Sequence, residues 1–112
     1  MDGTISVNQA IVRLAQPPAC MVAVRGILNF GFENHSLWHH LVAERHDSPY
    51  DSAIWLSAGD GSIQLNEPVL VRWHGRRVRV TGSLYGPRPG FGGCGHMSLF
   101  AAELLVASIE LD

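Results

Sequence analysis

Val22-Ala23-Val24-Arg25-Gly26-Ile27-Leu28 follows the pattern Val-x-Val-x-Gly-x-Leu, and residues 78–84 repeat it. Both copies alternate as a strand does when it buries one face. A glycine inside a strand weakens it unless the backbone bulges, bends or approaches another chain closely. Bent strands are what a small closed barrel requires. Gly26 and Gly82 therefore predict a strongly curved sheet.

The length and charge of the chain limit its organisation. It has 112 residues and a formal net charge of -2 at pH 7. This length suits a single domain over residues 1–112 with one modest core. A slightly negative chain lacks the overall positive field that accompanies avid nucleic-acid binding.

Cysteine content and hydropathy indicate the compartment. Cys20 and Cys94 are too few for a disulfide framework and form no Cys-x-x-Cys zinc pair. Residues 1–6 show no basic segment followed by an apolar run, as a secretory signal would. No stretch approaches the ~20 apolar residues of a membrane helix. We therefore expect reduced thiols and a soluble, cytoplasmic protein.

Local patterns predict the order of the elements. Ser6 and Gln9 resemble a capping box before a helix over residues 6–16, which the following two prolines end. Four segments are predicted as strands: 20–30, 36–42, 53–57 and 76–85. Residues 66–71 predict one helical turn, and the glycine-rich segment 86–96 a loop. Propensity favours helix over 98–105, whereas 106–111 alternate like a strand, so the conformation at the start of this last segment stays open.

A set of residues within this order resembles a known group of proteins. They are Gly26, Glu33, Asn34, Leu37, Trp38, Gly75, Val78, Val80, Gly82, Gly95 and His96. In outline, residues 5–110 resemble small bacterial proteins with an OB-like barrel, many of them uncharacterised. The resemblance implies an all-β fold, a small OB-like β-barrel of about five strands with a short N-terminal helix and a final strand. Because OB barrels host many unrelated roles, it implies a fold and no activity.

Histidines and cysteine offer candidate metal ligands. His35, His39, His40 and His46 fall close together, and neutral imidazole is a common ligand of transition metals. On a strand, His35 and His39 would project from one face and His40 from the other. The set to examine would be His35, His39 and His96, with Cys94 as a softer ligand. Solvated histidines are the simpler interpretation, and we expect no metal and no cofactor.

Two further motifs are typical of catalysis or phosphate binding. Residues 90–95 fit Gly-x-Gly-x-x-Gly, but they do not follow a buried strand and open a helix, as a dinucleotide fingerprint does. Cys94 lies two residues from His96, yet nothing in the sequence supplies the partner that orients a catalytic pair. We therefore predict no catalytic residue and no enzyme activity.

Arginine and aromatic residues supply the candidate binding site. OB barrels bind ligands on a face flanked by the loops between strands 1 and 2 and between strands 4 and 5. The residues predicted to line such a groove are Phe32, His35, Trp73, Arg76, Arg77, Tyr85, Arg88 and Phe91.

The composition favours a non-enzymatic interaction module. Tryptophan, other aromatic residues and arginine are common interface anchors, so binding to a protein partner is the leading hypothesis. A bacterial inhibitor or immunity-type protein would be a chain of this kind. Trp38, Trp55, Trp73 and Phe91 are the aromatic candidates, although Trp38 and Trp55 are also expected to be largely buried. The alternative is single-stranded nucleic-acid or oligosaccharide binding on the barrel face. The sequence does not fix the oligomeric state.

Overall fold

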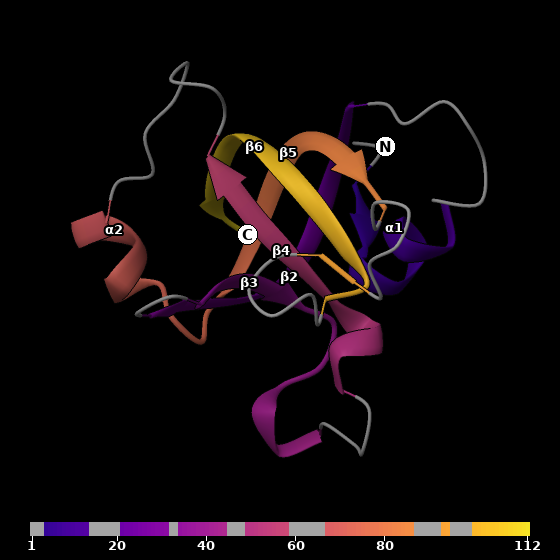
Figure 1. Cartoon of the computed structure of the whole chain (residues 1–112). Helices are drawn as coiled ribbons and strands as arrows, with labels where there is room; N and C mark the ends of the chain where they lie inside the picture. The colour runs from indigo at the N-terminus through magenta and orange to yellow at the C-terminus, as the bar shows by residue number, and fades with distance from the viewer. Residues whose placement is uncertain are drawn as a thin grey trace.

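Five strands close into a β-barrel in a computed structural model of the chain (Figure 1). The structure describes residues 4–13, 21–31, 34–44, 49–58, 67–86, 93–94 and 100–112. The barrel strands are β2 (Met21–Gly31), β3 (Asn34–Trp38), β4 (Ala53–Ala58), β5 (Arg77–Tyr85) and β6 (Ala102–Leu111). They are hydrogen-bonded in the order β2-β3-β4-β6-β5, and β5 pairs back with β2 to close the ring. Of these pairs, β4 with β6 is parallel and the others are antiparallel.

The two motif glycines lie where the strands are most crowded. A Cβ at Gly26 would lie 2.8 Å from Leu37 Cγ and 2.8 Å from Val7 Cγ2. A Cβ at Gly82 would collide with the backbone carbonyl of Leu105, and the register of β5 against β6 shifts between Thr81 and Gly82. The bulge and the close approach confirm the prediction of a curved, closed sheet.

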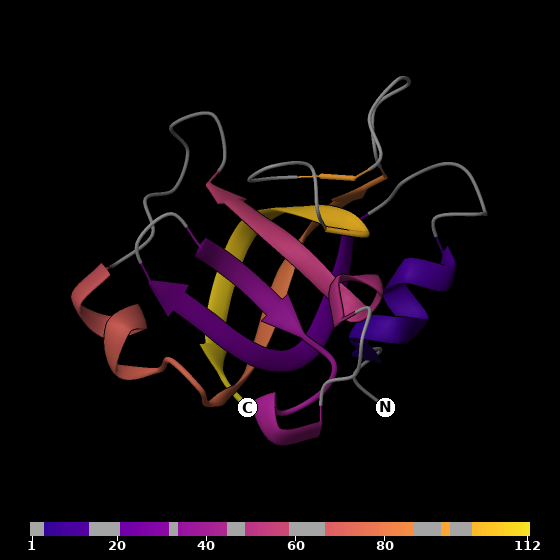
Figure 2. The same cartoon turned by 60° about the horizontal axis from the view of Figure 1, so that its bottom comes forward.

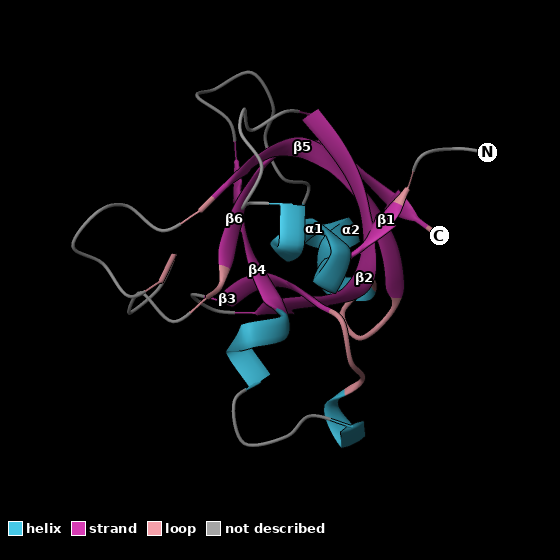
Figure 3. Cartoon of the chain, turned by 90° about the vertical axis from the view of Figure 1, so that its right-hand side faces the viewer, coloured by secondary structure: helices cyan, strands magenta, loops and turns pink. Residues whose placement is uncertain are grey.

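Helices cover both ends of the barrel. The helix α1 (Val7–Arg13) buries Val7 and Ala10 completely, and α2 (Glu67–Arg72) buries Leu70. These side chains belong to the same core cluster as the inward-facing strand residues. Figure 3 shows α1 and α2 across the ring of strands, and Figures 1 and 2 place them on opposite sides of it. The helices in the described part of the chain fall short of the length and apolar character that spanning a bilayer requires.

Several predicted elements are confirmed. The Ser6 N–H donates to Gln9 Oε1 at 2.8 Å and the Gln9 N–H donates to Ser6 Oγ at 3.1 Å, which is a reciprocal capping box. The predicted helix is seen as α1, and the end expected near residue 16 lies outside the described residues. The predicted strands over 20–30, 53–57 and 76–85 correspond to β2, β4 and β5, and the predicted turn over 66–71 is α2.

Other expectations need correction. The strand predicted over residues 36–42 ends at Trp38, and a 3-10 turn, η1 (Val42–Glu44), follows it. The reason is tertiary: on one side β4 begins at Ala53, opposite Trp38, and on the other side β1 takes up the edge of β2 at Val24 and Arg25. A second 3-10 turn, η2 (Pro49–Ser52), leads into β4. A short strand that sequence reasoning missed, β1 (Ile5–Ser6), pairs in parallel with β2.

The last segment is a strand from Ala102 onward. Residues 102–106 pair with 54–58 of β4, so the helical alternative is wrong for the part of the segment that the structure describes. Residues 98 and 99 lie outside the described residues. Inter-strand pairing on both sides of β6 decides this conformation against helix propensity.

Candidate functional site

The residues of the predicted groove lie at different ends of the barrel wall. Arg77 begins β5 and Tyr85 ends it, so the nine-residue strand separates the two. His35 lies beside Phe30 on the neighbouring strand, and their rings stack with centroids 4.4 Å apart. The remaining predicted residues Phe32, Arg88 and Phe91 lie outside the described residues.

The turn after α2 fixes one end of the predicted groove. The Gly75 N–H donates to the Leu28 carbonyl at 2.7 Å, and the Phe30 N–H donates to His74 Nδ1 at 3.0 Å. Gly75 has a φ of 81°, which only glycine adopts readily. Trp73 packs against the main core, whereas Arg76 and Arg77 are exposed. Trp73 therefore helps to fill the end of the barrel and is less suited to bind a ligand.

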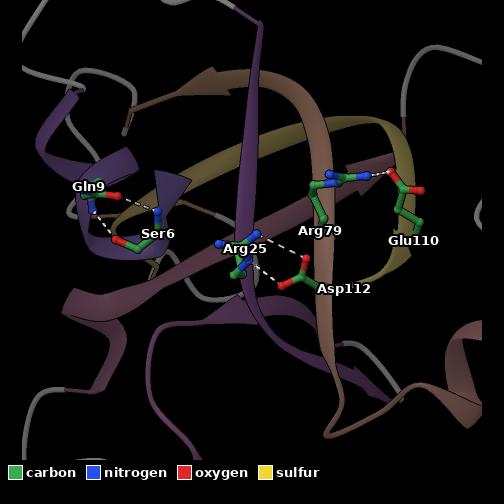
Figure 4. A network of polar contacts seen from close by, with 6 residues as sticks. All are labelled: Ser6, Gln9, Arg25, Arg79, Glu110 and Asp112. Carbon is green, nitrogen blue, oxygen red and sulfur yellow. Dashed lines mark hydrogen bonds and ion pairs between the residues drawn. The ribbon is translucent and has the colours of Figure 1, made fainter. Parts of the chain in front are cut away.

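Two other arginines are held by acids on the barrel wall. Arg25 and Arg79 are cross-strand neighbours on β2 and β5. Arg79 Nη2 lies 2.6 Å from Glu110 Oε1, and Arg25 forms an ion pair with Asp112 (Figure 4). This part of the wall is electrically balanced and does not present a cluster of unneutralised arginines.

A different set of side chains comes together on the outside of β4, β6 and β5. Alternate residues of these strands are buried in the core, so those between them point outward. The register places Trp55 beside Glu103, and Glu103 beside Tyr85. One step along, Ser57 lies beside Leu105, and Leu105 beside Ser83. We call this surface the Trp55 face, and it comprises Trp55, Ser57, Ser83, Tyr85, Glu103 and Leu105.

The Trp55 face combines aromatic, hydroxyl and carboxylate groups. Tyr85 is 48% exposed, and Trp55 and Glu103 are half-buried. The Ser57 hydroxyl donates to Glu103 Oε2 at 2.6 Å. Within the described part of the chain, Glu103 Oε1 has no hydrogen-bond partner and no cationic group pairs with this carboxylate. The face can therefore still accept a hydrogen bond or a positive charge.

One edge of this face is supported by a second apolar cluster outside the barrel. Its buried residues are Ile27, Trp38, Ala53, Cys94 and Phe100. The ring centroid of Trp55 lies 5.3 Å from the ring centroid of Phe100 and 6.1 Å from that of His35. Trp38 is 5% exposed, as expected, and its indole N–H donates to Ser36 Oγ at 2.8 Å. Trp55 keeps part of its surface on the outside.

The candidate nucleophile is unsuited to attack. Cys94 is a free thiol that is 7% exposed. Burial, and secondly the nearby negative charge of Glu103, raise the pKa of this thiol. Because the thiolate is the nucleophilic form, both effects suppress its reactivity. Its proposed partner His96 lies outside the described residues.

The histidines separate into different environments. His39 Nδ1 accepts the Asn8 backbone N–H at 3.3 Å, which ties α1 to the chain after β3. Burial first, and then the charges of His40 and Arg77, lower the pKa of His39. Among the described residues, no three of His, Cys, Asp and Glu gather in a group that could hold a metal ion. His46 and His96 lie outside that part of the chain.

No protein-family model, curated protein or solved structure matches this chain. The geometry of the barrel wall is therefore the basis on which a function can be proposed. Of the predicted binding residues, Tyr85 belongs to the Trp55 face, and Trp55 itself was among the aromatic interface candidates. Glu103, Leu105, Ser57 and Ser83 were missed, although the alternation of residues 102–106 would have marked the first two as outward-facing if this segment had been predicted as a strand.

Proposed function

We propose that the chain is a non-enzymatic binding module that engages a protein partner through the Trp55 face. The observation that carries this proposal is the cross-strand row in which a half-buried carboxylate lies between a tryptophan and a tyrosine. Aromatic residues with a few placed polar groups are typical of the centre of protein interfaces.

The strand order supports an OB-like interpretation of the barrel, in which the β4 part of the Trp55 face adjoins the usual ligand face and the β5 and β6 parts lie beyond it. Counting only the barrel strands, the order is 1-2-3-5-4 with closure of 4 on 1, which is the order of OB barrels. Such barrels use the outside of strands 2 and 3 and the flanking loops for ligands. Trp55 lies on the third barrel strand, beside the second.

Apolar surface extends the face beyond the central row. Met21 is 60% exposed and lies beside Ser83 on the neighbouring strand. Leu105 lies on the other side of Ser83 and is half-buried. These side chains would add desolvated contact area around the polar centre, as a protein partner requires.

Charge disfavours nucleic acid as the ligand. The described residues of the face include one carboxylate and no arginine. Arg25 and Arg79 on the adjoining wall are already paired with acids. A phosphate backbone would therefore meet a negative group where it needs cations.

Site-specific cross-linking tests the proposal. A photoreactive phenylalanine analogue replaces Tyr85, and as a control it replaces Val12, which is 72% exposed on α1. After irradiation in the producing cells, we expect one discrete protein adduct from position 85 and none from position 12. Adducts of equal yield at both positions, or adducts with nucleic acid or glycan in place of protein, would overturn the proposal.

A further inference from the structure

We infer that Glu103 is the receptor for a cationic side chain of the partner, an arginine or a lysine, seated between Trp55 and Tyr85. This inference rests on the proposed function and names the chemistry of the partner's anchor. It follows from the position, the bonding and the surroundings of one carboxylate.

The position of Glu103 places aromatic groups on both sides of it. Trp55 is its neighbour on β4 and Tyr85 its neighbour on β5. Directly opposed residues of an antiparallel pair have Cβ atoms roughly 4.5–5.5 Å apart, which brings the Tyr85 ring within reach of a group bound at the carboxylate. Trp55, opposed to Glu103 in the parallel pair, lies on the same outer face of the sheet. A cation near an aromatic face is attracted by the ring quadrupole. The same group would thus meet a negative charge and two π systems.

Among the described residues, none gives Glu103 a counter-charge. Ser57 donates to one oxygen, and the other has no hydrogen-bond partner within the described residues. Glu110 on the same strand is different, because it pairs with Arg79. Cys94, whose pKa is raised by burial and secondly by the charge of Glu103, stays a neutral thiol and supplies no charge. A half-buried carboxylate without a cation is a favourable place for an incoming one.

The surroundings favour an organic cation over a metal ion. A divalent ion in a protein needs several oxygen or nitrogen ligands, and the described residues contain no group of three that could supply them. Aromatic rings supply no oxygen or nitrogen ligand to a metal ion here, whereas the flat, weakly hydrated guanidinium of arginine stacks on aromatic faces. The hydroxyl of Ser57 holds the carboxylate in place without adding charge.

The probe that tests this inference is N-acetyl-arginine amide, with N-acetyl-citrulline amide as its neutral isostere. Titrations are followed by NMR on the wild-type chain and on Glu103→Gln and Glu110→Gln. With the arginine compound, we expect saturable chemical-shift changes at the Trp55 indole and at Tyr85. With the citrulline compound, the affinity derived from these changes should be at least tenfold weaker. Glu103→Gln should abolish these shifts, and Glu110→Gln, the matched control on the same strand, should retain them.

The outcomes separate the two proposals. Equal response to both compounds, no response at the Trp55 face, or full response in Glu103→Gln would overturn the cation receptor. If the cross-link from position 85 to a protein is nevertheless found, the interaction face stands without this anchor. If the arginine response is found but position 85 gives no protein adduct, Glu103 is a cation site, and both the proposed protein-binding function and the role of Glu103 as the anchor of a protein partner fail. Thermal unfolding of each variant verifies that it is folded.

Discussion

Arg25 and Arg79 lie directly opposite each other on β2 and β5, and each guanidinium is bound by a carboxylate from the C-terminal end of the chain. Like charges in this position repel. Glu110 and Asp112 remove that repulsion and hold the end of β6 against the wall (Figure 4). The balance bears on the proposed binding site because it leaves Glu103 as the acid on β6 without a cation in the described structure.

Removing both acids tests this balance. The double variant Glu110→Gln with Asp112→Asn should lose no more than about 1 kcal/mol of unfolding free energy, since both pairs lie on the outside of the barrel and are partly exposed. Urea unfolding at low and at high salt measures the loss, which should shrink as salt screens the two arginines. A loss that is unchanged by salt would show that charge is not the cause.

Substitution of Gly82 tests the closure of the barrel. An added Cβ would meet the Leu105 backbone, which cannot yield without breaking the pairing of β5 with β6. Gly82→Ala should therefore cost at least about 2 kcal/mol of unfolding free energy, measured in urea. Gly31→Ala is the control, because a Cβ there meets nothing within 4 Å, and it should change the free energy by less than about 0.5 kcal/mol. Equal effects of the two substitutions would contradict the fold.

His39 should make stability depend on pH. Its Nδ1 accepts a hydrogen bond from Asn8, and its pKa is lowered in the folded chain, so the folded state favours the neutral ring. The unfolded chain binds the proton near the ordinary pKa of about 6.5. The stabilisation is therefore present above about pH 6.5 and is lost as pH falls through that value toward the folded pKa.

Unfolding free energy measured across this range should fall less steeply in His39→Asn, whose side-chain oxygen can accept the same hydrogen bond at any pH. An NMR titration gives the pKa of His39 directly. His40→Asn should move it upward, since His40 contributes to the depression. A His39 pKa at or above the ordinary value would refute this explanation.

Cys94 should react slowly while the chain is folded. Burial raises its pKa and covers the sulfur. In a Cys20→Ser chain, which leaves Cys94 as the single thiol, alkylation at neutral pH should be at least tenfold slower than after denaturation. Similar rates in the two states would show that the thiol is accessible in the folded chain and would contradict this explanation.

The sequence predicted those features that are local in origin. Gly26 and Gly82 mark the bends because each sits inside an otherwise regular strand pattern, and Ser6 with Gln9 marks the helix start. The end of β3 at Trp38 was not predictable in this way, because the position where β4 begins to pair decides it.

The candidate site could not be predicted from the sequence alone, because the fold brings its residues together. Trp55 and Glu103 are far apart in the chain and meet because β4 and β6 pair in parallel. The predicted groove placed Arg76 and Arg77 with Tyr85 on one binding face, but an extended strand carries them to opposite ends of the wall. Proximity in sequence is a poor guide to proximity along a strand, because each residue adds roughly 3.3 Å.

The affinity of the cross-linked partner, once purified, tests the central claim most directly. Calorimetry compares the wild-type chain with Tyr85→Ala on the Trp55 face and with Val12→Ala on α1, both substitutions of exposed side chains. Tyr85→Ala should weaken binding by at least about tenfold, as loss of a central aromatic contact does, and Val12→Ala should leave it unchanged. Equal affinity of all three chains would contradict a binding site on the Trp55 face.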